Sequence, residues 1–138
     1  MDYMEGLFLD MFYDFGISDD EFRFILEQVP NIRNMKELEI NEKIGILSYV
    51  GCANRHIKNI IVSNPYYLER SNDDILRLIK YLRDIGISSL YLLFDMHPYL
   101  LNKDAFEIRN YVNDRINRGE LLEDIVDDIE SNPYIIEE

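Results

Sequence analysis

Residues 64–101, NPYYLERSNDDILRLIKYLRDIGISSLYLLFDMHPYLL, hold one complete copy of the pattern that decides the fold. Pro65 lies near the start of this stretch, Gly86 lies in its middle part, and Pro98 lies near its end. Proline cannot continue a helix, and glycine readily adopts the left-handed conformation that ends one. The stretch therefore predicts two helices, one that closes at Gly86 and one that stops just before Pro98.

The same punctuation recurs along the whole chain. The prolines are 35, 33 and 35 residues apart, and the glycines that precede them are 35, 35 and 33 residues apart. These residues are Gly16, Pro30, Gly51, Pro65, Gly86, Pro98, Gly119 and Pro133. A fixed period of this length is typical of stacked helical units. We therefore predict an all-α helical-repeat solenoid, a single domain over residues 1–138 with units at roughly 1–33, 34–68, 69–101 and 102–138.

Apolar residues repeat with the same period, at positions that share one face of a helix. Positions eight, five and four before the first three prolines are Phe22, Ile25, Leu26, Ile57, Ile60, Ile61, Leu90, Leu93 and Phe94. Positions eleven and seven before the last three glycines are Ile40, Ile44, Ile75, Ile79, Ile108 and Val112. We expect these residues to form the core. The fourth unit places Asp128 at one such position, as expected of a capping unit with a polar outer face.

Local features predict where helices begin and end. Ser71 and the acidic residues after it favour the N-terminus of a helix, and that helix should run to about Ile85. The residue before a proline is disfavoured in the helical conformation, so the helix that precedes each proline should stop at that residue. These residues are Asn64, His97 and Asn132, and the tyrosines that follow the prolines, Tyr66, Tyr99 and Tyr134, should pack between units.

The stretch 64–101 also resembles the repeat of the mitochondrial transcription termination factor (mTERF) family. The similar features are the Pro-Tyr-x-Leu segment at 65–68, the serine and acidic N-cap, and the closure Asp-Ile-Gly-Ile-Ser at 84–88. The resemblance extends over about residues 12–138. It implies that each unit folds as two helices plus a short 3₁₀ turn, that the units curve into a superhelix, and that nucleic acid binds along the concave surface.

Composition limits the class of protein. With 47% hydrophobic residues in 138, the chain is long enough to bury a core, and disorder is disfavoured. One cysteine and two histidines exclude an internal disulfide framework and a Cys/His zinc site. The opening residues lack the cationic start of a signal peptide, and no apolar run approaches a membrane span. We therefore expect a cytoplasmic protein with no metal, cofactor or membrane partner.

Basic residues gather in the middle of the chain. Residues 43–83 contain seven Lys or Arg against three acids, whereas residues 1–42 carry a net charge of −8 and residues 84–138 a net charge of −9. The candidate nucleic-acid-binding residues of this basic segment are Arg55, Lys58, Arg77, Lys80 and Arg83. The total charge of −13 opposes nucleic-acid binding, so an ordinary solvated surface is the simpler interpretation.

Acidic residues gather near the C-terminus, where no Lys or Arg follows Gly119. The candidate protein-binding residues are Glu120, Glu123, Asp124, Asp127 and Asp128. Such a patch is suited to docking on a basic protein surface, or to imitating nucleic-acid phosphates as an inhibitor from a phage or mobile element would do. The simpler alternative is a soluble capping helix.

No constellation of catalytic residues appears in the sequence. His56 has no obvious partner, His97 lies in the position before a proline, and Cys52 follows a helix-ending glycine without the pattern of a thiol enzyme. We therefore expect a non-enzymatic helical-repeat module that binds a protein with a basic surface. Nucleic-acid binding through the basic segment and phosphate mimicry remain as alternatives.

Overall fold

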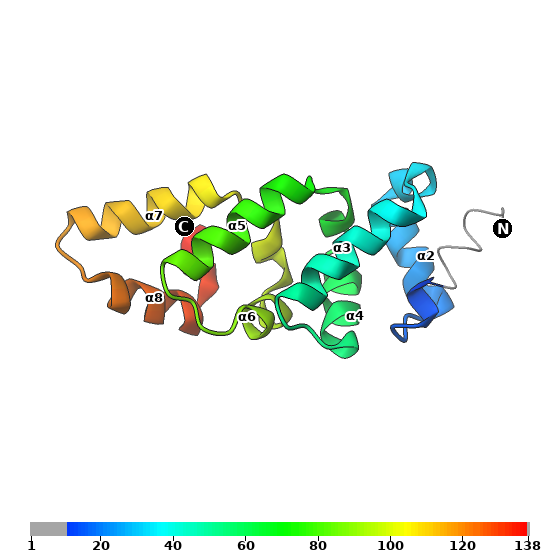
Figure 1. Cartoon of the computed structure of the whole chain (residues 1–138), viewed down its shortest axis with the longest axis horizontal. Coiled ribbons are helices and arrows are strands. Elements are labelled where there is room, and N and C mark those ends of the chain that lie inside the picture. The colour runs from blue at the N-terminus through cyan, green and yellow to red at the C-terminus, as the bar shows by residue number, and fades with distance from the viewer. Residues whose placement is uncertain (1–10, 138) are drawn as a thin grey trace.

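The computed structural model describes residues 11–137, and this part of the chain consists of helices and the turns that join them (Figure 1). The prediction of an all-α helical-repeat fold is confirmed. In chain order the elements are α2 (Asp19–Gln28), η1 (Pro30–Asn34), α3 (Glu37–Tyr49), α4 (Asn54–Ser63), η2 (Pro65–Glu69), α5 (Asn72–Asp84), α6 (Leu90–Met96), η3 (Pro98–Asn102), α7 (Ala105–Asn117), α8 (Leu122–Ser131) and η4 (Pro133–Glu137). Each η element is a short 3₁₀ helix that starts at a proline, as the family resemblance implied.

The helices stack in two rows (Figure 1). The odd row contains α3, α5 and α7, which pack side by side. The even row contains α2, α4 and α6, which also pack in order, and α8 extends it. We number the units by their prolines. Unit 1 includes α2 and η1, unit 2 is α3, α4 and η2, unit 3 is α5, α6 and η3, and unit 4 is α7, α8 and η4.

Glycine and proline end the helices as the sequence predicts. Gly86 has a φ of 108°, which strains any residue with a side chain, and the Ile87 N–H donates to the Leu82 carbonyl at 3.0 Å to close α5. Asn64 ends α4 directly before its proline, with φ at −138° and ψ at 71°. At the start of α5, Ser71 is the N-cap, and its hydroxyl accepts from the Asp74 N–H.

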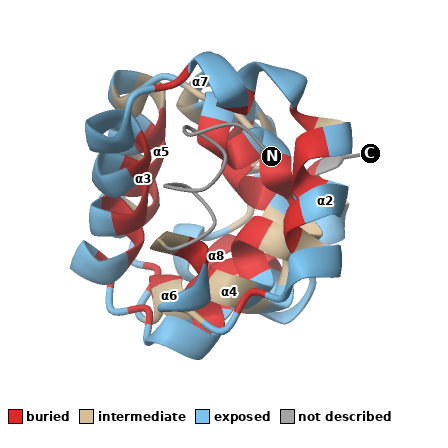
Figure 2. Cartoon of the chain, turned by 90° about the vertical axis from the view of Figure 1, so that its right-hand side faces the viewer, coloured by how far each residue is buried: buried red, intermediate tan, exposed pale blue. Residues whose placement is uncertain are grey.

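The predicted core positions are buried in every unit (Figure 2). All fifteen apolar residues predicted from the proline and glycine spacing are at most 7% exposed. Two further repeated positions join them, four residues before and one residue after each glycine. In units 1 to 3 these residues are Phe12, Ile17, Leu47, Cys52, Leu82 and Ile87. The stack is therefore held together by one continuous apolar interior to which every unit contributes.

Of the tyrosines that follow the prolines, two make contacts between units, and all three are at least 44% exposed. The Tyr66 hydroxyl donates to Gln28 of unit 1 at 3.0 Å. The Tyr134 ring meets His97 of unit 3 edge-on, with 4.8 Å between the ring centroids. Tyr99 is 54% exposed. These contacts lie along the edge formed by the 3₁₀ helices, and the buried tyrosine of this edge is instead Tyr67.

Candidate binding surfaces

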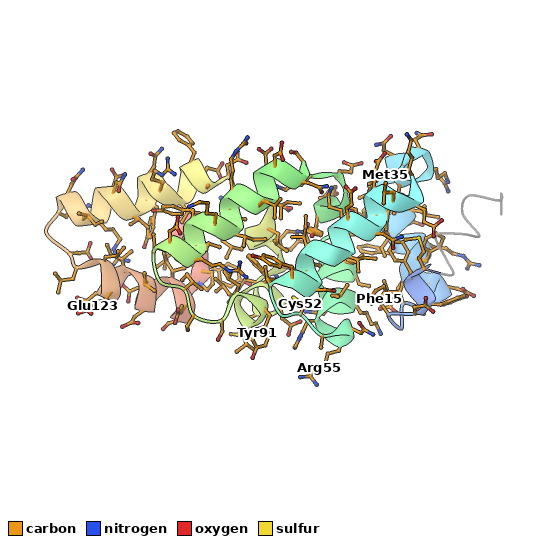
Figure 3. The ribbon with its side chains drawn as sticks, viewed as in Figure 1. Phe15, Met35, Cys52, Arg55, Tyr91 and Glu123 are labelled. Carbon is orange, nitrogen blue, oxygen red and sulfur yellow. The ribbon has the colours of Figure 1, made fainter. Side chains whose placement is uncertain are left out.

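The five candidate nucleic-acid-binding residues come from both rows. Arg55 and Lys58 lie on α4 of the even row, and Arg55 projects away from the molecule (Figure 3). Arg77, Lys80 and Arg83 lie on α5 of the odd row. The structure therefore separates the five residues into two groups.

Three of the five cations face carboxylates. The Lys58 ammonium lies 3.6 Å from Glu21 of α2, across the boundary between units 1 and 2. Arg77 pairs with Asp74 at 2.9 Å and Lys80 with Asp84 at 2.8 Å, each within α5. Exposed pairs of this kind contribute little to stability, but they place negative charge beside each cation. A phosphate that approached these side chains would meet a carboxylate as well.

Two other cations of the basic segment serve the interior of the stack. Lys43 is 5% exposed, and its ammonium donates to Asn72 at the start of α5 at 2.5 Å. Burial lowers the pKa of Lys43, and Glu42 nearby opposes that shift. Arg70 bridges to Asp104 at 2.9 Å and so links units 2 and 4. The net charge of residues 43–83 therefore overstates the positive charge at the surface.

Arginines of the odd row stack on tyrosines of the preceding unit. The guanidinium of Arg83 lies 4.8 Å from the centroid of the Tyr49 ring. The guanidinium of Arg109, which the sequence analysis did not select, lies 5.3 Å from the Tyr81 ring. An arginine stacked in this way keeps N–H donors available for a phosphate or a carboxylate. These pairs form because α5 packs between α3 and α7.

The five candidate acidic residues divide into two sets. Glu120 and Asp128 both bind the guanidinium of Arg115, which is 13% exposed and approaches each carboxylate to 2.5 Å. Hydrogen bonding from Arg115 holds the pKa of Glu120 below its usual range. The same bonds, first from Glu120 and then from Asp128, raise the pKa of Arg115. These two carboxylates line a wide polar groove of about 690 Å³ at the unit 4 end and share Arg115 as their cation.

The remaining candidates, Glu123, Asp124 and Asp127, are exposed on α8 (Figure 3). Glu130, one turn after Asp127, accepts a hydrogen bond from the Ser88 N–H at 3.2 Å. Together α6 and α8 carry six acidic residues and neither lysine nor arginine. This end of the even row is therefore a strongly acidic surface.

An apolar groove lies within that acidic surface. It has a volume of about 230 Å³ and is bordered by Ser88, Ser89, Leu92, Leu93, Met96 and Glu130. Leu92 is 44% exposed and Met96 is 61% exposed. Neither residue is predicted from the repeat, because the positions six and two before the other prolines are not consistently apolar.

The residues considered for chemistry have structural roles. Cys52 is buried, which raises the pKa of its thiol to about 11, with a smaller contribution from Asp95. His56 accepts a hydrogen bond from the Ala53 N–H at 2.9 Å, so its ring caps the start of α4. His97 ends α6 through its backbone, whereas its Nδ1 is buried without a hydrogen-bond partner. A neutral buried thiol is a poor nucleophile.

Residues 11–137 show neither a metal-binding cluster nor a membrane-spanning helix. No group of three or more His, Cys, Asp or Glu side chains in that range is arranged to hold a metal ion. No helix in the same range combines the length and apolarity that crossing a membrane requires.

Comparison with known proteins gives one match and one negative result. No curated protein matches the chain. The family model of mTERF matches residues 6–136, which is nearly the whole sequence. The matched range includes the four proline turns and both rows of helices described above. This chain therefore belongs to the mTERF family.

Proposed function

We propose that this chain is a non-enzymatic helical-repeat module that binds a protein partner with a basic surface. The observation that carries the proposal is the surface of α6 and α8, two helices that contain acidic residues but no Lys or Arg and that leave Leu92 and Met96 exposed. Opposite charge on a partner steers it to such a surface, and the apolar residues supply contact area.

The distribution of cations favours a basic protein over nucleic acid. A duplex or single strand would approach a chain of net charge −13, and three of the five candidate cations already face carboxylates. Binding to phosphates through a few cations is weak and depends strongly on salt. A basic protein meets no such repulsion on α8.

The test compares two variants of equal charge. The first neutralises α8 with Glu123→Gln, Asp124→Asn and Asp127→Asn. The second, the control, neutralises the odd row with Glu37→Gln, Glu39→Gln and Asp73→Asn. Both sets lie mainly in first helical turns, so their effects on helix stability are matched. Wild type is used to capture proteins from a native lysate, and the captured protein is purified for calorimetry.

We expect a basic protein that the α8 variant binds roughly tenfold more weakly, while the odd-row control binds it as wild type does. The affinity should also fall as salt is added. Equal binding by both variants, or retention of nucleic acid alone, would contradict the proposal.

Nucleic-acid binding is a second candidate, supported by family membership and by the stacked arginines of the odd row. It predicts that RNA or duplex DNA is retained at low salt, about 50 mM, and released as salt rises. Replacing Arg77, Lys80, Arg83 and Arg109 by Glu should abolish retention if the odd row binds. Replacing Arg55 and Lys58 by Glu should abolish it if α4 binds. A wild-type chain that shifts neither nucleic acid at low salt eliminates this candidate.

A further inference from the structure

The outward face of the even row differs from unit to unit at two equivalent positions. Six residues before each proline, the row presents Phe24, Asn59, Leu92 and Asp127 in order, all exposed. Two residues before each proline, it presents Gln28, Ser63, Met96 and Ser131. Only α6 is apolar at both positions. Because these positions are one helical turn apart, Leu92 and Met96 form a single apolar strip.

The junction between α4 and α6 is closed by hydrogen bonds at the first of these positions. The Asn59 amide donates to the Asp95 carbonyl at 2.8 Å and to its carboxylate at 3.0 Å. Ser63 then donates to the Asn59 side-chain oxygen at 3.3 Å. At the next junction the equivalent of Asn59 is Leu92, which cannot donate, and the equivalent of Asp95 is Glu130. The α6–α8 junction accordingly contains the apolar groove in place of that hydrogen-bonded contact.

One carboxylate of α8, that of Glu130, lines this groove, and two more lie on the same face of the helix. Glu123, Asp127 and Glu130 follow each other at i, i+4 and i+7, so they lie on one face of the helix. Glu130 itself lines the groove and is held in place by the Ser88 N–H. An apolar floor beside a row of carboxylates matches a segment that has apolar residues on one face and cations on the flank.

The size of the groove also limits its occupant. A volume of about 230 Å³ falls below the roughly 300–1,000 Å³ of small-molecule pockets. It is suited to one or two large side chains of a partner. Methionine and leucine at its rim adapt to different apolar shapes, as in other helix-binding grooves.

We propose that the α6–α8 groove docks a basic amphipathic helix of a protein partner. Its apolar face packs on Leu92 and Met96, and its lysines or arginines pair with Asp127 and Glu130. This proposal rests on the proposed function and adds to it the place of docking and the chemistry of the segment that docks.

The test uses a fluorescein-labelled synthetic amphipathic peptide of leucine and lysine, with binding measured by fluorescence anisotropy. The groove variant is Leu92→Asn with Met96→Ser, which gives α6 the outward residues that α4 carries naturally. The control variant is Leu38→Asn with Phe106→Ser, which removes two apolar side chains of similar exposure, 66% and 65%, from the odd row. A second peptide replaces every leucine by serine at the same charge. Thermal unfolding checks that all variants fold.

We expect the groove variant to bind the leucine–lysine peptide roughly tenfold more weakly than wild type, and the control to stay within about twofold. The serine peptide should bind weakly to all three proteins. The inference is overturned if the groove variant matches the control, if both peptides bind equally, or if wild type binds neither.

Failure here is distinguishable from failure of the proposed function. A captured partner that is lost on neutralising α8 but retained by the Leu92→Asn, Met96→Ser variant leaves the acidic surface as the binding site. That result would show that the groove is not part of the binding site. A captured partner that binds both variants as tightly as wild type contradicts both the proposed function and the docking groove.

Discussion

Units 3 and 4 have the same order of elements but carry side chains of opposite character at three equivalent positions. In unit 3 these positions are Leu82, Ile87 and Leu93, which are at most 6% exposed. In unit 4 they are Arg115, Glu120 and Asp128, joined by the hydrogen bonds of the Arg115 guanidinium. Both glycines have positive φ, 108° in unit 3 and 95° in unit 4, and α5 and α7 each have 13 residues.

This comparison separates what shapes a unit from what joins units. Proline and glycine give the helix pair its ends whether the side chains between them are apolar or ionic. An apolar residue at the three positions is stabilising where a neighbouring unit covers it. The ionic set instead lines a wide polar groove, so unit 4 has a polar face where units 2 and 3 have buried apolar residues. The variants below either remove the difference between the apolar set of unit 3 and the ionic set of unit 4 or measure its effect on stability.

The largest effect should come from giving unit 3 the residue of unit 4. Leu82→Arg places a cation at a position with no exposure and no carboxylate network, so we expect a loss of about 4 kcal/mol or more in the free energy of unfolding. Leu82→Ala, which leaves only a cavity, should lose about 3 kcal/mol. Urea denaturation measures both. Losses below about 1 kcal/mol for either variant would show that Leu82 does not act as a core residue.

Replacing the helix-ending glycine should cause a smaller loss of stability, and the loss should be similar in units 3 and 4. Gly86→Ala and Gly119→Ala each force a side chain into a left-handed conformation, and an added Cβ would meet no atom within 4 Å at either site. Backbone strain alone then costs about 1–2 kcal/mol in each. Thermal and urea unfolding should give equal losses. A loss confined to unit 3 would mean that unit 4 does not depend on the same closure.

Removing the centre of the ionic set should cost less. Arg115→Met leaves Glu120 and Asp128 facing each other without a cation, and because both carboxylates are more than one-third exposed, we expect a loss of only about 1 kcal/mol. As a control, the triple change Arg115→Leu, Glu120→Ile and Asp128→Leu recreates the unit 3 interior. It should restore stability but cause concentration-dependent self-association, measured by light scattering, because it exposes an apolar face. A monomeric triple variant would contradict the role given to the ionic set.

The smallest effect is a dependence on pH. The folded pKa of Glu120 is lowered below its unfolded value of 4.5, so its stabilising contribution is present above that pH and is lost as pH falls through the folded pKa. The melting temperature of Glu120→Gln should therefore lie below that of wild type at pH 7, and the gap should close in acid. A gap that persists unchanged below the folded pKa would mean that the charge of Glu120 does not contribute.

Much of the fold follows from the sequence because its causes are local. A proline at 65 or 98 ends a helix whatever surrounds it, and Gly86 closes α5 through its own backbone. The periodic apolar positions also follow from local geometry, since residues on one helical face must be buried together. Asp128 stood out in the sequence as a departure from that period, and its partner is Arg115 of the preceding helix.

The candidate surfaces could be predicted only in part. The acidic character of α8 is visible in the sequence, but the sequence does not show that Glu120 and Asp128 are paired with Arg115. Likewise, Arg83 and Arg109 acquire aromatic partners only through the packing of the odd row. The groove at Leu92 and Met96 breaks the repeat, so no periodic pattern points to it.

The order of residues by itself determined that this protein is a tandem array of helix pairs, where each pair ends, and which periodic apolar side chains form the core. Those properties arise from backbone restrictions and from helical spacing, which act over a few residues. The tertiary structure decided which charges neutralise each other, which arginines stack on tyrosines, and where apolar side chains remain uncovered. Several of these features depend on contacts between residues far apart in the sequence, such as Asn59 with Asp95 and Ser88 with Glu130. Such contacts exist only after the units have stacked, because no local rule brings their partners together.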